Sequence, residues 1–162
     1  MQNHWKVAYK TLLTSRTFMG CCLANFLTYG GLFAWITASS AILIDQLGLT
    51  PSTFGFCFGF SGSGLMLGAF INGLGVKRLG IERMLGLGWS IIMLSGIFLA
   101  TYSWIIEPSA AVVVASAFAF YIGCALIFAN TNARAFTPFG HIAGTAAGLY
   151  ALDRKSTRLN SS

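Results

Sequence analysis

The sequence predicts an all-α integral membrane protein, and three observations support that prediction. Hydrophobic residues make up 56% of the 162 residues, charged residues only 9%, and the mean hydropathy is +0.72. A soluble domain devotes about a quarter of its residues to charge, so this chain has too few charges to cover a water-facing surface. The charges also stand between long apolar stretches, each about as long as one membrane-spanning helix.

The charge-free stretches set the number of helices. About 20 apolar residues, rising 1.5 Å each, cross the roughly 30 Å hydrocarbon core of a bilayer. Between Arg16 and Arg134 the charged residues enclose stretches of 28, 31, 23 and 26 uncharged residues. Each is long enough for one helix and too short for two. The sequence therefore predicts helices at 17–40, 52–75, 84–104 and 109–131.

A fifth apolar stretch, 135–152, contains Pro138, Gly140 and His141. We expect its helix to begin near His141 and to stop at residue 152, after about twelve residues, which is too short to span a bilayer. Residues 153–162 turn abruptly polar and basic, and we interpret them as translated adapter or cloning sequence, a physiological tail being the alternative. The chain is thus expected to be a fragment.

Positive charges predict the orientation in the membrane. The connections 41–51 and 105–108 carry only the acidic residues Asp45 and Glu107. All basic residues before the tail fall on the opposite face, which is therefore predicted to be cytoplasmic, with 1–16 as a cytoplasmic lead-in. The same pattern explains the net charge of +6 without a nucleic-acid partner. The basic residues in question are Lys6, Lys10, Arg16, Lys77, Arg78, Arg83 and Arg134.

Two helix starts are marked by proline. Thr50 before Pro51 is typical of an N-cap followed by the first helical position. Glu107 before Pro108 predicts the same arrangement at the start of the fourth helix.

Glycines in the second helix predict close helix packing. The pairs Gly55/Gly59 and Gly64/Gly68 are each four residues apart, so each lies on one helix face and lets another helix approach. A nucleotide-binding loop is excluded, because these glycines neither follow a strand nor have the G-x-G-x-x-G spacing.

Polar and aromatic residues inside the helices favour a cavity. On the first helix Asn25, Tyr29 and Phe33 follow one another at steps of four, and Asn72 lies near the inner end of the second. The third helix offers only serines and threonines, as a lipid-facing support would. For any single polar residue an interhelical hydrogen bond is the simpler alternative, whereas three such helices together favour a cavity. The fourth helix contributes Tyr121, Phe128 and Asn132 on one face, with Asn130 beside them.

No catalytic or metal site is expected. The predicted spans contain no Asp, Glu, Lys, Arg or His, so an enzyme is disfavoured. His141 is interpreted as a capping or interfacial residue, with a proton relay as the alternative. The four cysteines lie in apolar stretches without zinc or redox spacing, and we interpret them as packing residues. They are Cys21, Cys22, Cys57 and Cys124, and no cofactor is expected.

Two stretches resemble a known family. They are FAWITASSAILIDQLGLTPSTFGFCFG, residues 33–59, and ANTNARAFTPFGHIAGTAAGL, residues 129–149. Both are similar to the bicyclomycin-resistance (Bcr/CflA) drug-efflux branch of the major facilitator superfamily. The likeness covers residues 17–152 and corresponds to the second half of such a protein, a C-terminal six-helix bundle that is truncated here in its fifth helix.

The connection at 73–83 resembles the superfamily's cytoplasmic signature. Gly73, Arg78, Gly80 and Arg83 match it in kind. Lys77 stands where that signature usually has an aspartate, which puts the charge-relay role of this position in doubt. Ser40 stands where the family usually has a proline.

The resemblance implies a twelve-helix bacterial transporter of the cytoplasmic membrane that exports hydrophobic or cationic drugs in exchange for protons. Its partners would be the lipid bilayer, the drug and the missing N-terminal half, which would supply the proton-exchanging acid. Three alternatives stay open: a transporter of a metabolite, a membrane scaffold or assembly subunit, and a nonfunctional truncated remnant. The candidates for the substrate cavity are Asn25, Tyr29, Phe33, Asn72 and Tyr121.

Overall fold

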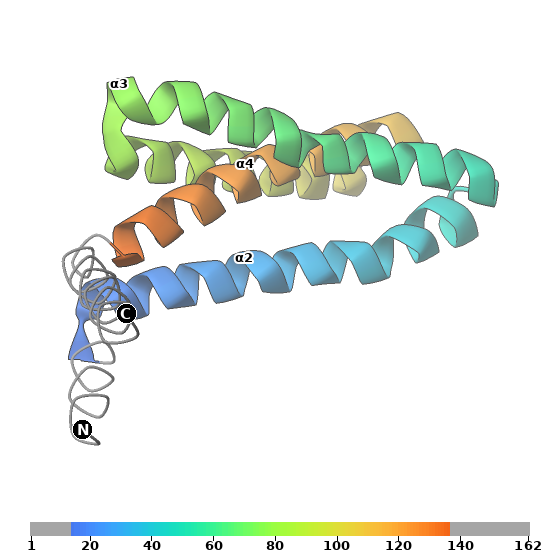
Figure 1. The fold of residues 1–162 in the computed structure, drawn as a ribbon. Coiled ribbons are helices and arrows are strands. Elements are labelled where there is room, and N and C mark those ends of the chain that lie inside the picture. The colour runs from blue at the N-terminus through green and yellow to red at the C-terminus, as the bar shows by residue number, and fades with distance from the viewer. Residues whose placement is uncertain (1–13, 137–162) are drawn as a thin grey trace, which may run out of the picture.

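The computed structural model describes residues 14–136, which form helices with no strand among them (Figure 1). The elements are α2 (Arg16–Ser40), the π-helix η1 (Ala41–Gln46), α3 (Pro51–Ile105) and α4 (Ala110–Phe136). Three stretches are long and apolar enough to cross a membrane: Arg16–Gln46, Pro51–Ile105 and Ala110–Ala135. The predicted all-α membrane fold is confirmed. The expected fifth helix at 141–152, His141, and the polar tail lie outside the described residues.

A single glycine folds α3 back on itself. Its 55 residues would measure about 80 Å if straight, far more than one membrane crossing. Gly80, with φ 77° and ψ 166°, adopts a backbone conformation that is essentially restricted to glycine. It divides α3 into a first arm, 51–79, and a second arm, 81–105, which run back along each other (Figure 1). The basic connection expected between two helices is therefore a one-residue corner, with its charges on the adjoining helical turns.

The helix that begins at Arg16 also runs further than expected. Residues 41–46, expected in a connection, form a π-helical turn that continues α2 directly. Leu43 in this turn is fully buried and packs with Val113 and Val114 of α4. Burial of this leucine ties the end of the helix to α4, which explains why the chain stays helical beyond Ser40.

Of the two predicted helix starts, one is confirmed. Thr50 caps α3 by accepting a hydrogen bond from Thr53 N at 3.3 Å, and Pro51 is the first helical residue. The prediction for Glu107 and Pro108 is wrong by two residues, because α4 begins at Ala110. Its first bonds run from Val112 and Val113 to the carbonyl oxygen of Ser109, so the chain passes Pro108 before it turns helical.

Helix α4 is the central element, in contact with α2 and both arms of α3. A Cβ atom at Gly64 or Gly68 would lie 2.5 Å from Phe118 O or 2.6 Å from Ile122 O, so these glycines allow the first arm to touch the α4 backbone. The predicted close approach is confirmed for this pair. Within residues 14–136 no helix approaches Gly55 or Gly59, because no atom there lies within 4 Å of a Cβ at either position.

A second close approach joins α4 to the second arm of α3. A Cβ atom at Gly123 would lie 2.9 Å from Gly88 O, and one at Gly88 would lie 3.1 Å from Gly123 O. The two glycines therefore face each other, and the backbones meet without side chains between them. Small residues thus hold α4 against both arms.

The charges of the described residues separate to opposite ends of the bundle. The start of α2, the corner of α3 and the end of α4 lie at one end (Figure 1), which carries Arg16, Lys77, Arg78, Arg83 and Arg134 with one acid, Glu82. Asp45 and Glu107 lie at the other. Arg134 Nη1 bonds to Glu82 Oε2 at 2.7 Å, which joins α4 to the second arm. We call these the basic end and the acidic end.

Candidate functional site

A polar seam joins α4 to α2 and to the first arm of α3. Thr131 Oγ1 donates to Asn25 Oδ1 at 2.8 Å, and Asn130 Nδ2 donates to Asn72 Oδ1. Asn130 and Thr131 are each 1% exposed, whereas Asn25 and Asn72 are half-buried. Two adjacent residues of one helix thus bind two different neighbours.

Hydrogen bonding within α4 completes the seam. Asn130 Nδ2 also donates to Leu126 O at 2.7 Å, and the Thr131 hydroxyl lies 2.6 Å from Ile127 O. Every partner matters here, because a polar group without one is costly in a medium that contains no water. Measured bonds of this kind between membrane helices contribute about 0.6 kcal/mol each, rarely more than about 1.7. The seam therefore fixes the relative rotation of three helices more than it adds stability.

Aromatic side chains continue the seam toward the acidic end. The rings of Tyr29 and Phe128 lie 4.4 Å apart at an angle of 33°. Tyr29 is 51% exposed, and Phe33, one turn further along α2, is 63% exposed. Three of the five candidates for the substrate cavity, Asn25, Tyr29 and Phe33, therefore lie along α2. The first two contact α4, and the third is exposed.

The two remaining candidates belong to the contact between α4 and the first arm. Asn72 follows Gly64 and Gly68 at steps of four, so the glycines that admit α4 also bring this amide to Asn130. Tyr121 is 3% exposed, and its Cβ lies 3.0 Å from where a Cβ of Gly64 would stand. Tyr121 is thus packed between helices, whereas Tyr29 and Phe33 are more than half exposed.

The signature-like residues surround the corner of α3. Gly80 makes the turn, and Arg78 and Arg83 are exposed on the turns before and after it, as is Lys77. Gly73 lies in the first arm with open space around it. The Arg134–Glu82 ion pair beside this corner was not predicted, because nothing in the sequence indicates which residues 52 positions apart will meet.

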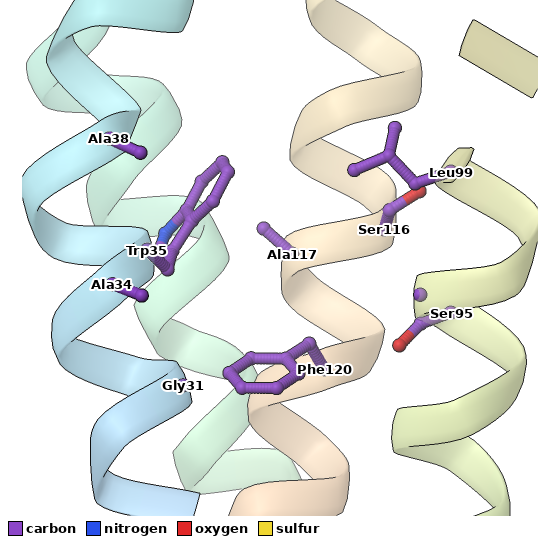
Figure 2. A pocket seen from close by; sticks show the side chains of 10 residues that line it. Gly31, Ala34, Trp35, Ala38, Ser95, Leu99, Ser116, Ala117 and Phe120 are labelled. Carbon is purple, nitrogen blue, oxygen red and sulfur yellow. The ribbon is translucent and has the colours of Figure 1, made fainter. Parts of the chain in front are cut away.

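A cavity of about 300 Å³ lies between α2, the second arm of α3 and α4, toward the acidic end (Figure 2). Trp35 and Phe120 supply its rings, and small residues such as Ala34, Ala38 and Ala117 its walls. The Trp35 Nε1 and Ser116 Oγ atoms are buried without a hydrogen-bond partner. None of the five candidates lines this cavity, which sequence reasoning missed because its walls are small and apolar.

Cysteines and acids form no metal site in the described part of the chain. No group of three or more His, Cys, Asp or Glu side chains is close enough to hold an ion there. Cys21 and Cys124 are buried, Cys57 is half-buried and Cys22 is exposed, and all four are free thiols.

Two curated proteins are similar to most of this chain. The uncharacterized MFS-type transporter YdgK of Bacillus subtilis is 30% identical over 139 residues, which are 86% of this chain and 34% of that protein. A bicyclomycin resistance protein homolog of Haemophilus influenzae is 30% identical over 142 residues, 85% of this chain and 34% of that protein. The chain spans about a third of the length of these relatives. No family model and no solved structure matches.

Proposed function

Because this chain is homologous to transporters of the major facilitator superfamily, we propose that it forms part of a multi-pass exporter of hydrophobic or cationic drugs in a bacterial cytoplasmic membrane. One relative is named for resistance to bicyclomycin, which supports the export of a drug. The proposed role of this part is to supply one wall of the substrate path. The remainder of a longer transporter would supply the facing wall.

The observation that carries this proposal is the free aromatic surface beside the polar seam. Tyr29 and Phe33 expose more than half of their surfaces although Tyr29 already contacts Phe128. Aromatic faces bind planar and cationic molecules through buried area and through attraction between the cation and the ring. The hydrogen bond between Asn25 and Thr131 restrains the rotation of α2 against α4 and thereby the direction in which these rings point.

Proton antiport is proposed from the resemblance to the bicyclomycin-resistance branch and not from any residue of this segment. The membrane-spanning parts of the described helices contain no acidic or basic residue, from Thr17 to Ile44 on α2 and η1 and likewise on both arms of α3 and on α4 away from their ends. The proton would therefore be exchanged on a residue of the longer transporter outside this segment. The work of this segment would be recognition of the drug and the helix movements that change access.

A chimera tests the proposal. The segment of the Haemophilus relative that matches this chain is replaced by the chain's own residues, and cells lacking their drug exporters are challenged with bicyclomycin and with a lipophilic cation. We expect protection, and we expect an uncoupler that collapses the proton gradient to abolish drug efflux. A chimera that reaches the membrane yet gives no protection contradicts the proposal.

Two variants of the chimera test the aromatic surface. Tyr29→Ala removes a ring worth about 1 kcal/mol of cation–π attraction, so we expect about a fivefold loss of transport efficiency for the cation. Phe98→Ala is the matched control, because Phe98 is an aromatic residue of the second arm with 53% exposure and its own ring contact, to Tyr102. Equal losses in the two variants would show that the ring at Tyr29 has no special part in recognition.

A further inference from the structure

A second cavity opens at the basic end, where α2, the second arm of α3 and α4 come together. It has a volume of about 370 Å³ and two arginines, Arg16 and Arg134, among its lining residues. Leu85 and Trp89 of the second arm form an apolar wall. Thr17, Gly20, Cys21, Ala24 and Thr131 complete the lining.

The two arginines keep most of their hydrogen-bonding capacity. Arg134 uses Nη1 to bind Glu82, and a guanidinium has five N–H donors in all. No carboxylate in the described part of the chain pairs with Arg16. Glu82 is itself 71% exposed, so water weakens its attraction for Arg134. The cavity rim therefore carries net positive charge.

The cavity is charged at one end and apolar at the other. Arg16 and Ala24 are eight residue steps apart on α2, which is about 12 Å along the helix axis. Arginine at the rim and Leu85, Trp89 and Ala24 further in match an amphiphile with an anionic head and a hydrocarbon chain. A free anion would find donors at the rim but no counterpart for the apolar wall.

From this arrangement we propose that the cavity binds an anionic phospholipid, with its phosphate between Arg16 and Arg134 and the upper part of one acyl chain against Leu85 and Trp89. Basic pockets between membrane helices on the cytoplasmic side are suited to anionic headgroups, because both charge and depth match. The positive end of the bundle is the one that the distribution of basic residues assigns to the cytoplasm. This site is separate from the aromatic surface of α2 and does not depend on drug export.

Two pairs of variants test separately the charge of the cavity rim and the space inside the cavity. Arg16→Gln with Arg134→Gln removes both rim charges, and Arg78→Gln with Arg83→Gln removes the same charge from exposed residues at the same end but outside the cavity. Gly20→Leu fills the cavity while keeping its charge, since nothing lies within 4 Å of a Cβ at Gly20. Gly30→Leu is its control on the same helix, where open space is also present.

The measurement is native mass spectrometry of the complete chain released from nanodiscs. The nanodiscs hold phosphatidylglycerol and phosphatidylethanolamine with identical acyl chains, and circular dichroism confirms the helix content of each variant. We expect one retained phosphatidylglycerol. Because each arginine contributes about fivefold in affinity, the cavity double variant should lose about thirtyfold, and Gly20→Leu should lose retention as well. The control double variant and Gly30→Leu should retain the lipid.

Three results would overturn the proposal. Equal losses in the two arginine pairs would mean that lipid responds to the charge of the whole end and not to the cavity. Retention in Gly20→Leu would mean that the apolar part of the cavity takes no acyl chain. Displacement of the lipid by millimolar inorganic phosphate would mean that the site binds a free anion, with the lipid only supplying the phosphate.

Discussion

Substitution of Gly68 by alanine should separate the first arm of α3 from α4. The Cβ of an alanine would stand 2.6 Å from Ile122 O, 2.7 Å from Ala125 Cβ and 3.0 Å from Ile122 Cα, whereas ordinary contacts begin at 3.4 Å. Two of these three atoms belong to the α4 backbone and cannot rotate away. The helices must therefore move apart by about 0.8 Å, the shortfall of the closest contact.

The expected cost follows from two opposing effects. Overpacking of a close contact costs about 1–3 kcal/mol. Alanine also stabilises a helix interior relative to glycine by about 0.5–1 kcal/mol. We therefore expect Gly68→Ala to lower the free energy of unfolding by up to about 2.5 kcal/mol. Gly59→Ala lies in the same arm but has open space around it, so it gains helix propensity without overpacking. It should be neutral or slightly stabilising.

The assay is unfolding of the purified chain in mixed micelles with increasing SDS, followed by tryptophan fluorescence and circular dichroism. Because Asn72 lies one turn beyond Gly68 on the same stripe, separation should also weaken its bond to Asn130. Gly68→Ala and Asn72→Leu should therefore be less than additive. If Gly68→Ala unfolds at the same SDS fraction as Gly59→Ala, the close contact between the first arm and α4 is refuted.

Three further predictions concern the corner, the seam and the orientation. Gly80→Ala should lower the free energy of unfolding by about 1–3 kcal/mol, because φ 77° with ψ 166° is strained for any residue with a Cβ; unchanged SDS unfolding would contradict this corner geometry. A double-mutant cycle of Asn72→Leu and Asn130→Leu should give a coupling near 0.6 kcal/mol and at most about 1.7, and zero coupling would mean that the two amides do not bond. In a variant without native cysteines, cysteines at Asp45 and Glu107 should react with an impermeant maleimide from outside intact cells, and those at Lys77 and Arg134 only after permeabilisation. Reversed labelling would overturn the orientation.

The sequence was sufficient where a single local cause decides the structure. Charge-free stretches predicted the membrane fold, because hydrocarbon thickness fixes helix length whatever the helix packs against. Thr50 and Pro51 predicted a helix start, because the cap is made within one turn. Asn25 and Asn72 were predicted as cavity residues with an interhelical hydrogen bond as the simpler alternative, and the structure contains such a bond at each.

Which helix face meets a neighbouring helix, and which residues pair there, could not be predicted from the sequence. Gly55/Gly59 and Gly64/Gly68 have the same spacing, yet only the second pair meets α4. In lipid the outward and inward faces of a helix are equally apolar, so hydrophobic periodicity does not tell them apart. The pairing of Asn72 with Asn130 also depends on how two helices rotate when they pack. Gly80 was predicted to lie in a connection between two helices, because the charges around it are typical of a loop. The structure reduces that connection to Gly80 alone, and nothing in the sequence distinguishes a one-residue corner from a longer loop.

The central place of α4 has a consequence for how the protein is made. Ribosomes deliver α2 and both arms of α3 to the membrane before α4 is synthesised, and α4 is the element that joins them, because α2 and α3 have few contacts with each other. Until it arrives, Gly64, Gly68, Gly88 and the amides of Asn25 and Asn72 face lipid or the insertion machinery. The earlier helices therefore reach their final packing only after α4 has entered the membrane. A chain that ends before residue 110 would hold α2 and both arms of α3 without the helix that joins them, so we expect it not to form this packing.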